Sequence, residues 1–143
     1  MSIDVLEEAL RVNVSHRLLY LLKMMRENEN ISKKDFRALH FGEDVVQLST
    51  QHIKYVTYFY FVQRLKKGDI KCQKLHRYLS LLCMLYGLTT LMRDATNCFS
   101  CGYFQSGVDY ANLMQTAIKK INVELRPQII PLIESLKISD MFL

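Results

Sequence analysis

Residues that interrupt regular structure are scarce in this chain. Its 143 residues include five glycines and two prolines, the residues on which turns and loops chiefly depend. This scarcity predicts long regular elements joined by few turns. Seven methionines, many leucines and a hydrophobic fraction of 50% favour helices packed around one sizeable core. The sequence therefore predicts a single all-α domain over residues 1–143.

Apolar residues recur every three or four positions in four long segments, which predicts four amphipathic helices. These helices are expected over residues 3–25, 43–67, 69–98 and 107–125. We expect the following side chains to face the core: Ile3, Leu6, Leu10, Val14, Leu18, Leu21 and Met25; Val46, Ile53, Val56, Phe59 or Tyr60, and Leu65; Leu75, Tyr78 or Leu79, Leu82, Leu85 or Tyr86, and Met92; Val108, Leu113, Ala117, Ile121 and Leu125.

Polar and glycine-containing stretches mark the boundaries of these segments. The run 26–30 (RENEN) ends the first helix, and Ser32 with Asp35 predicts the start of a second one that buries Phe36 and Leu39. Gly42 is expected to divide that region from the helix that follows. Residues 55–62 (YVTYFYFV) contain strand-preferring residues. The helical spacing before them nevertheless favours an aromatic-rich helix.

Turn residues also predict the connections of the second half. Lys67, Gly68 and Asp69 read as a turn in which Asp69 caps the third long helix. Gly102 and Gly107 bracket another turn, after which Ser106 or Gly107 caps the fourth.

Pro127 should end that helix near Arg126, because proline disfavours the α region for its predecessor. A further helix would then carry Ile129, Ile130, Leu132, Ile133 and Leu136 inward. Together these signals predict an up-and-down bundle of four main helices with a Pro-broken C-terminal helix.

The order of short motifs in the last part of the chain resembles a known family. Gly102-Tyr103-Phe104, then a helix, Glu124-Leu125-Arg126-Pro127, an apolar helix and Ser139-Asp140-Met141-Phe142-Leu143 are similar to the C-terminal helical domain of the peroxisomal acyl-CoA oxidases. Leu85-Tyr86-Gly87-Leu88 and Arg93-Asp94 fit the same pattern. The resemblance covers roughly the last 65 residues and rests on the order of the motifs.

This resemblance implies an FAD-dependent oxidase that converts a fatty acyl-CoA to a trans-2-enoyl-CoA and passes the electrons to oxygen, giving hydrogen peroxide. In the family, the flavin pocket and the catalytic glutamate belong to the larger part upstream, and no position of this chain matches that glutamate's motif. We therefore expect no catalytic residue here and no tight FAD binding by this chain alone. Its expected role is structural or dimer-forming, with the upstream flavin-binding body or a second copy as partner.

Two other classes of function stay open. The chain could be a non-enzymatic helical module that binds a partner helix or subunit through an exposed apolar face. It could also be a small cytosolic enzyme, although no cluster of titratable residues indicates an active site. The sequence carries no phosphate-binding glycine loop, dinucleotide fingerprint or nucleophile elbow.

Charge and targeting patterns exclude further classes. The formal net charge of +5 comes from scattered pairs such as Lys33-Lys34, Lys66-Lys67 and Lys119-Lys120, whereas nucleic-acid binding calls for basic residues on one face. We expect neither a signal peptide nor a membrane span. Peroxisomal location is implied by the resemblance, although no Ser-Lys-Leu type tripeptide ends the chain; otherwise the protein is expected to be cytoplasmic.

Candidate metal-binding and titratable residues favour structural roles. Cys72, His76, Cys98 and Cys101 have the right chemistry for zinc, but we expect reduced thiols and no metal. A redox role for the last two would need a helix N-terminus, and they lie at an expected C-terminus. The remaining candidates are His16, His40 and His52, and the acidic groups Glu7-Glu8, Glu27 to Glu29 and Asp35. His52 and His76 are expected to face the core, and the carboxylates to be solvated.

Overall fold

The computed structural model describes residues 2–36, 41–103 and 107–135, and this part of the chain is all-α, without a strand. The prediction of an all-α fold is thus confirmed. The elements are α1 (Ile3–Glu27), α2 (Lys33–Asp35), α3 (Gly42–Lys66), α4 (Gln73–Arg93), α5 (Ala95–Ser100), α6 (Gly107–Leu125), the 3₁₀ turn η2 (Arg126–Gln128) and α7 (Ile129–Ser135).

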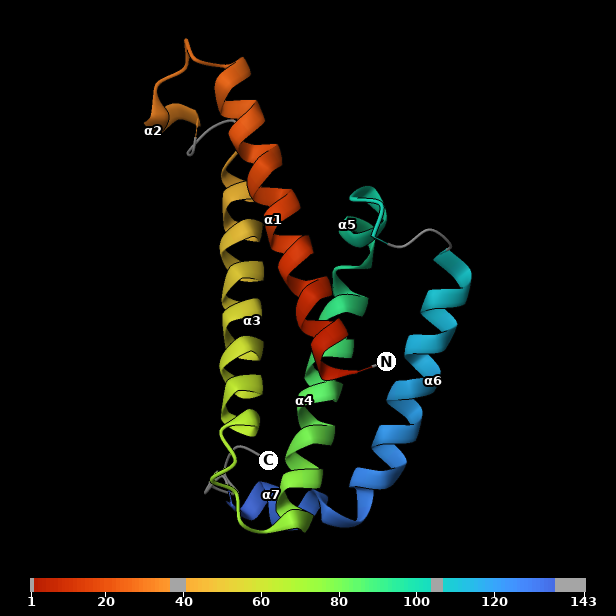
Figure 1. Cartoon of the computed structure of the whole chain (residues 1–143). Helices are drawn as coiled ribbons and strands as arrows, with labels where there is room; N and C mark the ends of the chain where they lie inside the picture. The colour runs from red at the N-terminus through yellow and green to blue at the C-terminus, as the bar shows by residue number, and fades with distance from the viewer. Residues whose placement is uncertain (1, 37–40, 104–106, 136–143) are drawn as a thin grey trace.

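The four long helices run alternately up and down, as predicted (Figure 1). Helices α1, α3 and α4 pack against one another and form a three-helix core, whereas α6 lies mainly along α4. The bundle is therefore three helices with a fourth added at one side. Because α6 lies chiefly against one neighbour, much of its surface is left facing away from the core.

Local capping explains where the first helices begin. The Ser2 hydroxyl accepts a hydrogen bond from the Val5 N–H, and Asp4 places a negative charge in the first turn of α1. Ser32 accepts from the Asp35 N–H at 3.1 Å and donates to the Asp35 carboxylate at 2.6 Å. The start at Ser32 and the burial of Phe36 are confirmed, although α2 is a single short turn. Leu39 lies outside the described residues.

Tyr58 of α3 lies at the centre of the core and is fully buried. Its hydroxyl donates to the Ile3 carbonyl oxygen at 3.1 Å, which joins α3 to the first turn of α1. It belongs to one apolar cluster with side chains of all three core helices, among them Leu6, Val62 and Leu88. The aromatic run 55–62 is thus helical, as predicted.

The prediction of which α3 side chains face the core is partly wrong. Val46, Ile53 and Tyr60 are 64%, 65% and 68% exposed, whereas the buried residues of this helix are Gln51, Tyr58, Val62 and Leu65. Residues 46, 53 and 60 are seven apart and form one face, and the buried set forms nearly the opposite one. Because both faces of α3 are apolar, helical spacing alone could not identify the inner one.

Predicted core positions on other helices are also exposed, because these helices too carry apolar side chains on more than one face. Leu18 and Leu75 are more than two-fifths exposed, and Leu113 is 66% exposed. On α6 the predictions for Ile121 and Leu125 are confirmed, since both are buried, and Met114 is buried in place of Leu113. The side chain of Val108 lies outside what the structure describes.

The chain turns differ from the predictions at two places. Asp69 does not cap α4, which starts at Gln73 with Cys72 at its N-cap, and the Asp69 carboxylate pairs with Arg64 at 2.6 Å. The third long helix also stops early, at Arg93, because Asp94 leaves the helical region with φ −103° and ψ 17°. The shorter α5 then carries the chain to Ser100.

The C-terminal break lies where the sequence predicts it. Helix α6 ends at Leu125, Pro127 sits in the η2 turn, and α7 follows from Ile129. The inward direction predicted for α7 is wrong for Ile129 and Ile130, which are 48% and 68% exposed. Ser106, Phe104, Leu136 and the tail 139–143 lie outside the described residues.

Candidate functional site

The four residues considered as zinc ligands do not come together. Cys72 and His76 lie at the start of α4, while Cys98 and Cys101 belong to α5 and its end. About twenty helical residues separate the two pairs, which corresponds to roughly 30 Å along α4. Across the described part of the chain, no group of three or more His, Cys, Asp or Glu side chains is placed to hold a metal ion.

The histidines occupy three unrelated environments. His52 is exposed on α3, so the expectation that it faces the core is wrong. His76 is half-buried, with Nε2 at 3.3 Å from the Leu65 carbonyl oxygen. His16 is half-buried on α1, and its Nδ1 has no hydrogen-bond partner among the described residues. His40 lies outside the described residues.

Two of the four cysteines are buried thiols. Burial raises the pKa of Cys98 to about 12 and that of Cys83 to about 11. A thiol reacts through its thiolate, so these two groups are poor nucleophiles at neutral pH. Cys101 donates its S–H to the Cys98 carbonyl oxygen at 3.2 Å, and all four cysteines are free.

A polar cavity of about 460 Å³ lies where α1, α3 and the α4–α5 junction meet. Three cationic side chains line it, Arg17, Lys54 and Arg93, together with the carboxylate of Asp94. Its other lining residues are Val46, Gln47, Thr50, Gln51, Thr96 and Asn97. We call this space the polar cavity.

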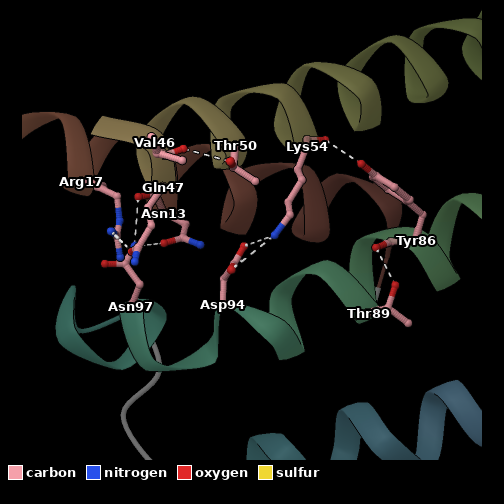
Figure 2. Close-up of polar contacts among 10 residues, drawn as sticks. All are labelled: Asn13, Arg17, Val46, Gln47, Thr50, Lys54, Tyr86, Thr89, Asp94 and Asn97. Atoms are coloured by element: carbon pink, nitrogen blue, oxygen red, sulfur yellow. Dashed lines mark hydrogen bonds and ion pairs between the residues drawn. The ribbon is translucent and has the colours of Figure 1, made fainter. Parts of the chain in front are cut away.

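A hydrogen-bond network holds the walls of the polar cavity in place (Figure 2). Arg17 of α1 donates to the Gln47 side-chain oxygen of α3 and lies 3.7 Å from an Asp44 carboxylate oxygen. Lys54 of α3 pairs with the Asp94 carboxylate at 3.3 Å. Asn97 of α5 donates to the side-chain oxygen of Asn13 on α1. The three helices are thus joined by side chains at this point.

Some buried polar atoms around the polar cavity lack partners. Gln51 is 6% exposed, yet its Oε1 accepts no hydrogen bond from a described residue. The Nε–H of Arg17 is likewise buried and donates to no described group. Leaving such an atom unsatisfied costs about 1–3 kcal/mol, and buried polar groups in folded proteins are nearly always paired with protein, water or ligand. An ordered water or a bound molecule would satisfy such atoms.

A second hollow is apolar and lies between α4 and α6. It has a volume of about 320 Å³ and is lined by Leu88, Tyr110, Leu113, Met114, Thr116, Ala117 and Lys120. We call it the α4–α6 groove. Towards the C-terminal end of α6, Val123 is 73% exposed. Ile129 and Ile130, at the start of α7, are exposed as well. Apolar side chains left uncovered in this way are typical of contact surfaces.

The polar cavity could not be found from the sequence. Arg17, Lys54 and Arg93 are far apart in the chain, and no short motif connects them. Gln51 lies in a polar stretch, Ser49 to His52, so its burial becomes visible only once α3 is known to turn that face inward.

The fold defines a small all-α domain without a metal cluster among its described residues. The family model for acyl-CoA oxidase matches residues 2–143. The chain therefore belongs to the acyl-CoA oxidase family. No curated protein matches it, and no solved structure does. This family carries out oxidation of fatty acyl-CoA and in general depends on FAD.

Neither the polar cavity nor the α4–α6 groove has the lining expected of a site for a whole flavin. An isoalloxazine ring needs a shaped cavity with a few well-placed hydrogen-bond groups. The polar cavity is lined by three cations and several amides, and the α4–α6 groove offers mainly apolar side chains in about 320 Å³.

Within the described part of the helices, none is both long and apolar enough to cross a bilayer.

Proposed function

We propose that this chain acts as the C-terminal helical domain, or a short form, of an FAD-dependent acyl-CoA oxidase-like protein. In this proposal the domain supports the oxidase by packing and does not itself perform the chemistry. The family reaction, acyl-CoA with oxygen to trans-2-enoyl-CoA and hydrogen peroxide, takes place on an upstream flavin-binding body. The observation that carries the proposal is the family match over residues 2–143. Exposed apolar side chains on α6 and α7, such as Leu113, Val123 and Ile130, support it.

The uncovered surface of α6 supports a docking role. Helix α6 packs chiefly on α4, so Leu113 and Val123 remain 66% and 73% exposed. Burying an apolar side chain of this size contributes about 1.5–3 kcal/mol. A partner that covers the α4–α6 groove would therefore gain several such contributions. The proposed partner is the flavin-binding body or a second copy of the chain.

The cellular location follows from the family in the same proposal. Fatty acyl-CoA oxidation of this type belongs to the peroxisome, where the hydrogen peroxide can be removed. The docking surface is supported by the exposure of the α6 and α7 side chains, independently of cellular location and of FAD binding.

A second candidate function rests on the same surface. In this alternative the chain is a stand-alone interaction module that binds an amphipathic helix of an unrelated protein in the α4–α6 groove. Both candidate functions predict that the apolar surface of α6 binds a partner. Only the first predicts that this binding changes the activity of an acyl-CoA oxidase. The two candidate functions are distinguished by testing whether the chain raises the peroxide release of an acyl-CoA oxidase body.

The test uses purified chain, alone and mixed with an acyl-CoA oxidase body made without its C-terminal helical domain. We expect the chain alone to be colourless and to release no peroxide from palmitoyl-CoA, and the mixture to gain peroxide release. A yellow chain with one bound flavin per protomer would overturn the proposal.

Variants on α6 make the same test specific. Leu113→Glu places a charge in the α4–α6 groove and should abolish the gain. Asn112→Glu is the matched control, because Asn112 is an exposed polar neighbour on the same helix, and it should keep the gain. Equal effects of the two variants would show that the groove is not the docking surface.

A further inference from the structure

The polar cavity has a cationic lining and unpartnered polar atoms that the packing of the three helices does not use. We propose that it binds a small molecule that bears an oxyanion group, phosphate or carboxylate, together with a hydrogen-bond donor such as a hydroxyl. This inference does not depend on the proposed docking function, since the polar cavity and the α4–α6 groove share no lining residue.

The charge around the polar cavity favours an anion. Arg17, Lys54 and Arg93 supply three positive charges, and the carboxylates near them are Asp94, at 3.3 Å from Lys54, and Asp44, at 3.7 Å from Arg17. The lining itself holds three cations and one carboxylate, Asp94, a net charge of +2. The carboxylates of Asp44, beside Arg17, and of Glu43, which accepts from Gln47 at 2.9 Å, lie next to the lining. Arg93 is exposed and forms no ion pair with a carboxylate in the described part of the chain. An oxyanion would balance its charge.

The unpartnered atoms specify both ends of the ligand. The buried Nε–H of Arg17 needs an acceptor, and guanidinium groups match the oxygens of phosphate and carboxylate. The buried Oε1 of Gln51 needs a donor, which a simple oxyanion lacks. Thr50 already donates its hydroxyl hydrogen to the Val46 carbonyl oxygen at 2.9 Å, so its oxygen is placed to accept only. A ligand that presents an oxyanion and a hydroxyl or N–H group would complement these lining residues.

The size of the polar cavity is consistent with a small ligand. Its volume of about 460 Å³ lies within the range of pockets that hold metabolites. Water molecules also satisfy buried polar atoms in a cavity of this kind, but water does not neutralise a surplus charge. The combination of net positive charge with an orphaned, nine-tenths buried amide distinguishes an anion site from a wet gap.

The test is an NMR titration of the whole ¹⁵N-labelled chain with inorganic phosphate, acetate and glycerol 3-phosphate, each at one ionic strength held constant with chloride. We expect saturable shifts of the Asn97 and Gln51 side-chain amides with phosphate or acetate. The arm that saturates first assigns the oxyanion as phosphate or carboxylate. If phosphate is the group, glycerol 3-phosphate should bind several-fold more tightly than phosphate, because its hydroxyls can donate to Gln51.

Two variants and one control test the assigned roles. Arg93→Gln should weaken anion binding about threefold to tenfold, and its exposed position leaves folding intact. Gln51→Leu should remove the preference for the hydroxyl-bearing ligand while keeping the binding of the simple anion. Arg126→Gln, which removes an exposed arginine of η2 outside the polar cavity, should change neither.

Three results would contradict the proposal. The first is that none of the three probes produces saturable shifts beyond those of chloride. The second is that Arg93→Gln and Arg126→Gln weaken binding equally, which would mean that only net charge matters. The third is that the shifts lie on α6 and α7, which would place the anion at another surface. If Gln51→Leu fails to fold, the comparison of Arg93→Gln with Arg126→Gln still decides the question.

Discussion

Gly87 of α4 lies directly against the ring of Tyr58 of α3. A Cβ atom placed on Gly87 would be 2.7 Å from Tyr58 Cε2 and 3.3 Å from Leu6 Cδ1, and the Tyr58 side chain is fully buried. The closest approach of α3 and α4 therefore depends on a residue without a side chain. This explains a glycine inside a long helix, where its own propensity is unfavourable.

Gly87→Ala should destabilise the protein although alanine is the better helix former. The gain in helix propensity is about 1 kcal/mol, whereas forcing a methyl group into a filled core costs up to about 3 kcal/mol. The overpacking wins, and we expect the free energy of unfolding in urea to fall by about 2 kcal/mol. In a Tyr58→Leu background the same substitution should cost much less. An unchanged or increased stability of Gly87→Ala would show that the two helices can separate at no cost.

Pro127→Ala should have little effect on stability. Pro127 is exposed and lies at the start of the η2 turn, where the N–H that proline lacks has no required acceptor. We expect the free energy of unfolding to change by less than about 1 kcal/mol and the helical circular-dichroism signal to rise slightly. A loss of several kcal/mol would instead mean that the turn between α6 and α7 is held in a strained conformation.

Stability should decline in alkaline solution because buried thiols resist ionisation. Burial raises the pKa of Cys98 to about 12 and that of Cys83 to about 11, and it also raises the pKa of Tyr58. In each case the folded state holds its proton longer than the unfolded chain does. The resulting stabilisation is therefore complete below the ordinary thiol pKa and is lost progressively as the pH rises towards the raised values.

The measurement is the free energy of unfolding between about pH 8 and about pH 10. It should fall as the pH rises, and the fall should be shallower in Cys98→Ala. Cys72→Ala is the control, because Cys72 is exposed. A slope that Cys98→Ala leaves unchanged would contradict the assignment to this thiol.

The same thiols should differ in their reaction with a disulfide reagent at neutral pH. Cys72 is exposed and should react first, whereas Cys83 and Cys98 are buried and should react at the rate at which the protein opens. Mass spectrometry of partly labelled protein identifies the order. Rapid labelling of Cys98 in the folded chain would show that α5 does not cover it.

Helix positions were predictable because their signals are local. The start of the first helix after Ser2, the small turn after Ser32 and the break at Pro127 each depend on neighbours in the sequence. The break at Asp94 was not predicted, and neither was the contact made there, in which the Asp94 carboxylate pairs with Lys54 of α3. An aspartate within an apolar segment does not indicate from the sequence which distant residue it will pair with.

Helix faces were harder to predict because α3 and α6 carry apolar side chains on more than one side. On α3 the side containing Tyr58 was chosen by the packing of both α1 and α4, and the side containing Ile53 was left exposed. The polar cavity was beyond prediction for a related reason. It joins Arg17, Lys54 and Arg93 from three helices, and no spacing within one segment reveals it.

We propose that this chain supports an acyl-CoA oxidase through its α6 surface and has no oxidase activity of its own. The most direct measurement is peroxide release from palmitoyl-CoA by three samples: the chain alone, a flavin-binding acyl-CoA oxidase body that lacks its C-terminal helical domain, and the mixture of the two. We expect release only from the mixture, and no gain when the chain carries Leu113→Glu. Peroxide release by the chain alone, or an equal gain with Leu113→Glu, would contradict it.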